Sequence, residues 1–211
     1  MAVTWETVRH QVAIAGVVSN AQTQEKMRGV VVKIEDGPAE FLQWLNLQKK
    51  QYPDTWSKMT ERPDQTMTSV DGLYYFLDLP DGQYTLQARL PGAGSRYDSE
   101  EVTATVSHDG DKIVWTNADI QLPTTTLKGQ ITFINDDDEP EGVLMAKVRV
   151  QSSGESVFAD HDGNYLLTEL EGGERTVLVS AQGYEQTSVT LVLPGDGSVT
   201  TQNFSLTPIE T

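Results

Sequence analysis

The stretch that decides the fold is DGLYYFLDLPDGQYTL, residues 71–86. It contains two turn sequences, the dipeptide Asp71-Gly72 and the tripeptide Pro-Asp-Gly that begins at Pro80. Glycine tolerates a positive φ, and proline and aspartate favour tight turns. The segments next to these turns are short and rich in aromatic and aliphatic residues, as strands are. The stretch therefore predicts a β-hairpin.

The same pattern occurs a second time, as DGNYLLTELEGGERTVLV at residues 162–179. A glycine within an upstream apolar run also recurs, as Gly16 and Gly129. These two glycines are 113 residues apart, whereas the two Asp-Gly pairs, at Asp71 and Asp162, are 91 apart. The difference of 22 residues indicates an insertion in the first repeat, which we assign to residues 38–65.

The repeats define the predicted architecture of the 211-residue chain. Each repeat contains about seven short strands separated by frequent turn signals, which is typical of a β-sandwich. We therefore predict an all-β protein of two tandem antiparallel seven-stranded Greek-key β-sandwiches, the first with a short helical insertion. The predicted parts are an N-terminal arm at residues 1–10, a first sandwich at residues 11–122 and a second at residues 123–211.

The insertion has the pattern of a helix. It begins PAEFLQWLNLQKKQY, in which Pro38 and Glu40 suit the first helical turn and Pro53 ends the run. Its apolar residues recur at helical spacing. The helix could cap one end of the sandwich, or it could present side chains to a partner. The partner-binding candidates are Trp5 in the arm and Phe41, Leu42, Trp44, Leu45, Leu47 and Trp56 in the insertion.

The repeat resembles the carboxypeptidase regulatory-like domain, with its pattern T-x-x-D-G-x-Y-x-x-x-x-L-x-x-G-x-Y-x-L. The first repeat matches every position from Thr68 to Leu86. The second is less regular, because Arg175 stands where the family usually has its later aromatic residue. The resemblance implies a prealbumin-like sandwich that acts as a structural spacer or an interaction module, not as a catalyst. Some relatives with a similar sandwich bind starch.

A second resemblance involves shorter segments. ERPDQT at residues 61–66, the hairpin at residues 71–86 and LPGAGSRY at residues 90–97 are similar to proteins encoded beside phage-tail-like contractile injection particles. This resemblance implies that the partners belong to such a particle.

The sequence offers few groups for catalysis. A zinc peptidase would need a His-x-x-Glu pair, but the residues three positions after the histidines are Ala13, Asp111 and Asn164. The chain has no cysteine, no Gly-x-Ser-x-Gly elbow and no phosphate-binding Gly-Lys-Ser/Thr motif. We therefore predict that the protein is not an enzyme and holds no cofactor.

One acidic loop is a weak candidate for calcium. Asp136, Asp137, Asp138 and Glu139 provide a dense group of the carboxylate oxygens that calcium prefers. A solvated loop without a metal is the alternative interpretation.

Charge and composition limit the partners. The net charge of −16 argues against nucleic acid, since a polyanion repels an acidic surface. There is no apolar run long enough to span a membrane, no visible signal peptide and no cysteine. These features predict a cytoplasmic location without membrane insertion, with association to a particle as an option.

The predicted function follows from architecture and resemblance. We expect a non-enzymatic structural or adaptor protein that binds other proteins of a multi-subunit assembly, such as a contractile phage-tail-like injection particle. The alternative is a carbohydrate-binding module of a surface or secreted protein, in which Trp44 and Trp56 would form a platform for sugar rings.

Overall fold

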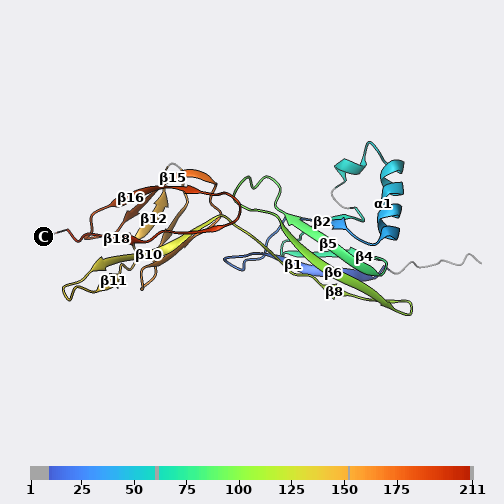
Figure 1. Ribbon diagram of the computed structural model, residues 1–211, viewed down its shortest axis with the longest axis horizontal. Helices are drawn as coiled ribbons and strands as arrows, with labels where there is room; N and C mark the ends of the chain where they lie inside the picture. The colour runs from blue at the N-terminus through green and yellow to red at the C-terminus, as the bar shows by residue number, and fades with distance from the viewer. Residues whose placement is uncertain (1–9, 60–61, 152, 210–211) are drawn as a thin grey trace, which may run out of the picture. The chain divides into compact units, whose positions relative to one another are not determined.

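The computed structural model describes residues 10–59, 62–151 and 153–209 (Figure 1). The chain divides into two compact units. Unit 1 comprises residues 1–91 and 99–122, and unit 2 comprises residues 92–98 and 123–211. Each unit is built of β-sheets, which confirms the all-β prediction. The predicted arm lies outside the described residues, apart from His10.

Unit 1 contains two sheets. In the first, β1 (Val12–Asn20) pairs with β4 (Leu73–Leu77) on one side and with β8 (Thr116–Asn117) and β9 (Ile120–Leu122) on the other. The second sheet has the order β3 (Gln65–Met67), β2 (Val31–Asp36), β5 (Gly82–Arg89), β6 (Glu100–Asp109) and β7 (Lys112–Val114).

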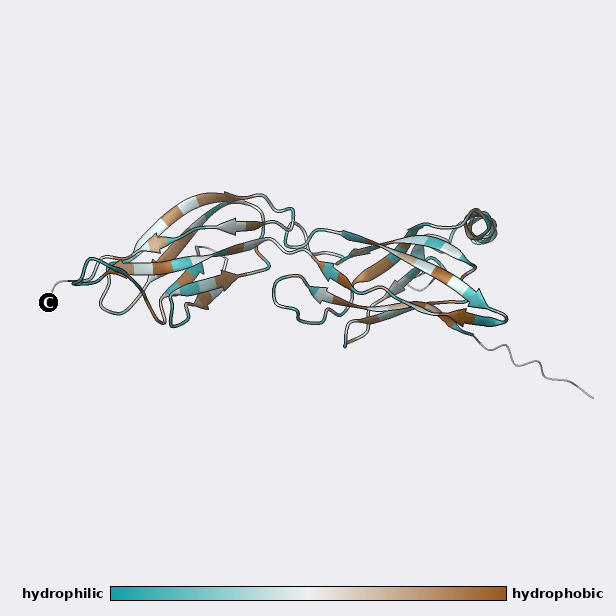
Figure 2. Ribbon diagram, turned by 60° about the horizontal axis from the view of Figure 1, so that its bottom comes forward, coloured by the Kyte–Doolittle hydropathy of each residue, from teal (hydrophilic) through white to brown (hydrophobic). Residues whose placement is uncertain are grey.

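Unit 2 repeats this plan. In its first sheet, β10 (Thr126–Ile134) pairs with β11 (Pro140–Gly142), β14 (Asn164–Leu167), β17 (Val199–Thr201) and β18 (Phe204–Ser205). The second sheet has the order β13 (Ser156–Phe158), β12 (Lys147–Val150), β15 (Gly173–Ser180) and β16 (Thr187–Leu193). Hydrophobic and hydrophilic residues alternate along many of the strands (Figure 2), as expected when one face of a sheet packs against a core.

The sheets differ from the predicted antiparallel arrangement in one respect. The last strand of each unit, which we call its closing strand, consists of two segments, β8 and β9 in unit 1 and β17 and β18 in unit 2. Both segments pair in parallel with the first strand of their unit, β1 or β10. The chain reaches each closing strand from the other sheet, so a hairpin turn does not dictate its direction. Each closing strand is also interrupted, at residues 118–119 in unit 1 and 202–203 in unit 2. The described part of each unit has nine strand segments instead of seven, and the interruption accounts for one of the two additional segments.

These interruptions explain the recurring glycine. A Cβ atom on Gly16 would lie 2.2 Å from the carbonyl oxygen of Ala118, at the break between β8 and β9. A Cβ atom on Gly129 would lie 1.9 Å from the carbonyl oxygen of Gln202, at the break between β17 and β18. Backbone atoms cannot approach a side chain so closely, so only glycine fits at both positions.

The tyrosine of the Asp-Gly-x-Tyr pattern contacts the same point of each closing strand. The hydroxyl of Tyr74 donates a hydrogen bond to the carbonyl of Ala118, and the hydroxyl of Tyr165 donates to the carbonyl of Gln202 at 2.6 Å. Burial raises the pKa of both hydroxyls, so they remain donors at any ordinary pH. The two features that repeat in the sequence thus stabilise one feature of the fold, the contact of β4 or β14 with the closing strand. The β-hairpin predicted at residues 71–86 is wrong, because β4 pairs with β1 while β5 pairs with β2 and β6 in the other sheet. The turn at Pro80 therefore carries the chain from one sheet to the other.

The insertion forms the predicted helix. The helix α1 (Ala39–Gln51) follows Pro38, which is the N-cap residue and not the first helical residue, and a 3₁₀ turn, η1 (Trp56–Lys58), comes after it. Phe41 is buried beneath α1, where its ring meets the ring of Tyr84 at a centroid distance of 5.6 Å. The last residue assigned to the insertion, Gln65, already belongs to β3.

The boundary predicted at residue 122 misses one segment. Residues 92–98 connect β5 to β6 of unit 1, yet they belong to unit 2. Ser95 Oγ accepts a hydrogen bond from the amide of Gly172 at 2.8 Å. Arg96 Nη1 donates to Glu155 Oε1 at 2.9 Å and to the carbonyl of Glu169 at 2.7 Å. These bonds account for the assignment of the segment to unit 2.

Candidate functional site

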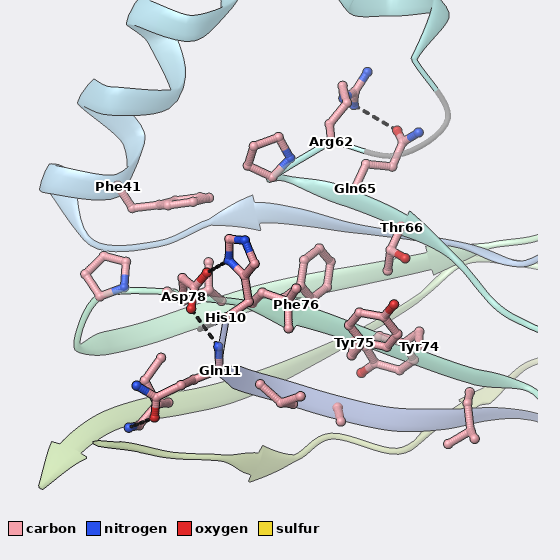
Figure 3. Close-up of a pocket in the computed structure, with 18 of the residues that line it drawn as sticks. His10, Gln11, Phe41, Arg62, Gln65, Thr66, Tyr74, Tyr75, Phe76 and Asp78 are labelled. Carbon is pink, nitrogen blue, oxygen red and sulfur yellow. Dashed lines mark hydrogen bonds and ion pairs between the residues drawn. The ribbon is translucent and has the colours of Figure 1, made fainter. Parts of the chain in front are cut away.

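The candidate site is a groove of about 1430 Å³ in unit 1, bordered by α1, β3, β4 and the start of β1 (Figure 3). Partly exposed apolar side chains line much of it, namely Val12, Trp44, Met67, Leu73, Tyr75 and Leu77. Charged and titratable side chains also border it, namely His10, Glu40, Arg62, Asp71, Asp78 and His108. A groove with this lining suits a ligand that has apolar side chains and a few polar groups.

The strand β4 supplies the apolar centre of the groove. Tyr74 and Phe76 point into the core and are 1% and 3% exposed. The residues that alternate with them lie on the outer face, where Leu73, Tyr75 and Leu77 are 46%, 56% and 38% exposed. Sandwich strands usually place polar residues on their outer face. The strand is therefore apolar on both faces, which the packing of the core does not require.

Unit 2 provides an internal comparison for this face. Counting from the shared Asp-Gly pair, Leu73, Tyr75 and Leu77 correspond to Asn164, Leu166 and Thr168. Two of the three outward apolar positions are thus polar in unit 2. On the neighbouring strand, counting from the shared glycine, Ala15 and Val17 correspond to Lys128 and Gln130. The same fold is stable with a more polar outer face, so the apolar face is a property of unit 1 alone.

The sequence did not identify the β4 residues as candidates. It contained one usable signal, the run LYYFL at residues 73–77, which has no polar residue on either face. A strand with only one buried face normally alternates between apolar and polar residues. The unbroken run was therefore evidence for an additional apolar contact, although it did not show on which face that contact lies.

Two histidine–carboxylate pairs border the groove. His10 contacts Asp78, whose other oxygen accepts a hydrogen bond from the amide of Gln11 at 2.8 Å (Figure 3). His108 contacts Asp81 in the turn after β4. Neither pair resembles a hydrolase triad, because a triad also needs a hydroxyl or thiol beside the imidazole. Ser69 also lines the groove, and its single hydroxyl proton is shared between Asp71 and the carbonyl of Leu73.

Asp78 is expected to make unit 1 sensitive to acid. Partial burial raises the pKa of Asp78, but the hydrogen bond from Gln11 and the contact with His10 outweigh it, so the pKa lies below its ordinary value. A lowered folded-state pKa stabilises the fold above the unfolded pKa of about 4, and this stabilisation is lost as the pH falls through the folded value. We expect the urea midpoint to fall more between pH 5 and pH 3 in the wild type than in Asp78→Asn, whose amide oxygen can still accept from Gln11. Equal losses would contradict this role.

The predicted partner-binding residues of α1 have different surroundings. Phe41 and Leu45 are buried, and of these two only Phe41 is among the residues that line the groove. Leu42 is half-buried. Trp44 is 43% exposed and lines the groove, whereas Leu47 is exposed but is not among the residues that line it. Of this set, Trp44 is the side chain best placed to contact a ligand in the groove.

Trp5 and Trp56 are the two other predicted aromatic candidates. Trp5 lies outside the described residues, and Trp56 is not among the residues that line the groove. Trp56 is half-buried, and the cationic groups of Lys49 and Arg62 lie 6.0 Å and 5.4 Å from the centre of its ring. Its ring therefore packs with cations of its own unit and is a poorer platform for a sugar than the sequence suggested.

The acidic loop of unit 2 is arranged around an asparagine. The side-chain oxygen of Asn135 accepts hydrogen bonds from the amides of Asp137 and Glu139 at 3.1 Å and 3.0 Å. The side chains of Asp136, Asp137, Asp138 and Glu139 are exposed. Among the described residues, the one group of potential metal ligands that lie close together is elsewhere, at Asp160, His161 and Asp162. All three are exposed, and Asp160 accepts hydrogen bonds from the amides of its own turn.

Similarity to solved structures extends over most of the chain, at low identity. The Bacillus anthracis TIE protein is 14% identical with a TM-score of 0.39, and the match covers 94% of this chain and 34% of that protein. A streptococcal ancillary pilin is 15% identical with a TM-score of 0.35, covering 95% and 63%. The shaft pilin SpaA of Lactobacillus rhamnosus GG is 10% identical with a TM-score of 0.40, covering 97% and 100%. This chain therefore spans less than two thirds of the first two proteins.

These comparisons bear on two expectations. The predicted cytoplasmic location is contradicted, because the matched structures include pilins of Gram-positive bacteria, which are surface proteins, and we withdraw it. The resemblance to proteins of phage-tail-like particles receives no support from the matches. No curated protein sequence matches this chain. Among the described residues, no helix is long and apolar enough to cross a membrane.

The sequence of unit 2 matches a family model. The match extends over residues 126–207, from the first residue of β10 to beyond β18. This range includes Gly129, Tyr165 and the closing strand that both residues contact. Residues 126–207 are thus similar to the carboxypeptidase regulatory-like domain, and the resemblance seen in the sequence is confirmed for unit 2.

Proposed function

We propose that this chain is a non-enzymatic structural or adaptor protein of a multi-subunit assembly, and that it binds a partner protein in the groove of unit 1. The observation that supports this proposal is the outer face of β4, where Leu73, Tyr75 and Leu77 expose apolar area beside Trp44. Contiguous exposed apolar patches of this kind mark interaction sites. Aromatic side chains are frequent anchors of such sites.

The test compares variants in capture of a partner from cells of the source organism. We expect Tyr75→Glu, which places a charge in the centre of the groove, to lose a partner that the wild type retains. The matched control is Val192→Glu, which places the same charge on an exposed valine of β16 in unit 2. Loss of the partner with both variants, or with neither, would contradict a role for the groove.

Carbohydrate binding is the second candidate function. Trp44 and Tyr75 favour it, because both line the groove and both are substantially exposed. A sugar ligand would stack on these rings, so a polysaccharide column would retain the wild type and release Trp44→Ala. This function would be favoured over protein binding if the polysaccharide column retained the wild type and the capture experiment yielded no partner protein.

A further inference from the structure

The strand β4 lies at the edge of its sheet. It pairs with β1, and no other described strand pairs with it. On the side away from β1, the carbonyl of Leu73 accepts a hydrogen bond from the amide of Ser69 at 2.9 Å, so the edge open to an added strand begins at Tyr75. The amide of Val18 donates to the carbonyl of Gly72 at 2.9 Å, and the amide of Asp78 donates to the carbonyl of Gln11 at 2.9 Å. Gly72 and Asp78, the two even-numbered residues next to the ends of β4, thus direct their backbone groups towards β1. Backbone groups alternate along a strand, so Tyr75 and Leu77 direct theirs to the opposite side. This side can accept an added strand.

The free edge of β4 and the apolar outer face of β4 together indicate which kind of ligand the groove can bind. An added strand would gain backbone hydrogen bonds from the edge of β4 and apolar contacts from the groove. Side chains of a strand alternate, so two apolar residues at positions i and i+2 would face the groove together. Because Glu40, Asp71 and Asp78 already border the groove, a strongly acidic strand would be repelled. The geometry therefore fits an extended, largely apolar segment without net negative charge.

Residues 1–9 of the chain have this composition. Their sequence, MAVTWETVR, places Val3 and Trp5 two positions apart. Glu6 and Arg9 cancel, so the side chains of the segment are neutral although the whole chain has a net charge of −16. Nine extended residues span about 30 Å, and the five residues of β4 span about 17 Å, so the segment is long enough. The described chain begins at His10, which lines the groove.

The contacts of Asp78 favour a segment from another molecule. The backbones of Gln11 and Asp78 are hydrogen-bonded, and Asp78 also binds His10 and the amide of Gln11 through its side chain. These contacts hold residues 10 and 11 on the side of β4 that β1 occupies. The free edge is on the opposite side, so the same chain would have to cross the end of β4 and reverse direction. A second copy can approach that edge directly.

We propose that the groove of unit 1 binds residues 1–9 of a second copy of this chain as a strand added to β4. This inference rests on the proposed function and names its partner. The two contacting surfaces differ, since one is a segment and the other a groove. Such a heterologous contact leaves a free segment and a free groove at the ends of each dimer, so further copies can be added.

The test measures self-association of the full chain by sedimentation. We expect concentration-dependent association of the wild type, weakened about tenfold or more by Trp5→Ala and by Tyr75→Glu, because truncating a central aromatic anchor has effects of this size. Val192→Glu should associate like the wild type. Trp5→Ala keeps an intact groove and Tyr75→Glu keeps an intact segment. An equimolar mixture of the two variants should therefore form a dimer at concentrations at which each variant alone is mostly monomeric.

Other outcomes would overturn the inference. A wild type that stays monomeric up to millimolar concentration excludes a second copy as the occupant. If Tyr75→Glu still loses a different captured protein in that case, the proposed function stands and this inference alone fails. Association that neither variant weakens, or a mixture that stays monomeric, would also contradict it. Should Tyr75→Glu not fold, as judged by circular dichroism, Leu73→Ser tests the same face with a smaller change.

Discussion

Replacing Gly16 by alanine is expected to destabilise unit 1 by about 3 kcal/mol or more, because the new methyl group would collide with backbone. The added Cβ atom would lie 2.2 Å from the carbonyl oxygen of Ala118 and 2.6 Å from its carbonyl carbon. A flexible side chain could move aside, but these atoms belong to the closing strand, whose position is set by its pairing with β1. The strand would have to separate from β1, which would also break the hydrogen bond from Tyr74.

The measurement is urea unfolding, and the matched control is Gly110→Ala in the same unit. Gly110 has a positive φ of 60°, and a Cβ atom there would meet nothing within 4 Å. Alanine at that position is strained but does not collide, so it should cost about 1 kcal/mol. The corresponding change in unit 2, Gly129→Ala, should match the larger effect, since its Cβ atom would lie 1.9 Å from Gln202. A cost for Gly16→Ala no larger than that of the control would contradict the collision.

The sequence predicted those parts of the fold that depend on local chemistry. The turns at Gly72 and Gly163 need a positive φ, which both residues adopt, at 75° and 77°. The helix after Pro38 was also recognisable, because proline, an early acidic residue and apolar spacing all occur within a few residues. The recurrence of Gly16 at Gly129 indicated a common scaffold, although the carbonyl that requires the glycine could be located only in three dimensions.

The parts that were missed depend on contacts between distant residues. Nothing within residues 116–122 shows that this segment runs parallel to β1, because strand direction is set by the path of the whole chain. The assignment of residues 92–98 to unit 2 depends on contacts such as that of Ser95 with Gly172, 77 residues away. The β4 side of the candidate site was missed for a related reason, although Trp44 on α1 was predicted. The run LYYFL predicts a buried strand equally well with either face inward, so the exposure of Tyr75 could not be deduced.

Replacing Arg62 by methionine is expected to destabilise unit 1 by about 3 kcal/mol, because it removes the main partner of a buried carboxylate. The side chain of Asp64 is 1% exposed, and its Oδ1 accepts a hydrogen bond from Arg62 Nε at 2.8 Å. The guanidinium also donates to Gln65 Oε1 at 2.8 Å and to the carbonyl of Trp56 at 3.2 Å. It therefore connects the end of the insertion to the start of β3, at one border of the groove.

The expected cost is at the lower end of the range for a broken buried pair. Lys49 Nζ lies 3.9 Å from Asp64 Oδ2, so it can partly neutralise the charge that Arg62 leaves behind. A second change, Asp64→Asn, removes that charge. The double variant Arg62→Met/Asp64→Asn should therefore recover part of the loss if the unpaired charge is its cause.

The control for Arg62→Met is a pair at the surface. Lys33 Nζ lies 2.7 Å from Glu35 Oε1, with both side chains about one third exposed. Water screens this pair, so Lys33→Met should change the free energy of unfolding by less than about 1 kcal/mol in urea titrations. If Arg62→Met cost no more than this control, the prediction would be wrong. Water or Lys49 would then replace Arg62 as the hydrogen-bond partner of the Asp64 carboxylate. A double variant no more stable than Arg62→Met would show instead that the bonds of the guanidinium to Trp56 and Gln65 are what stabilises this border of the groove.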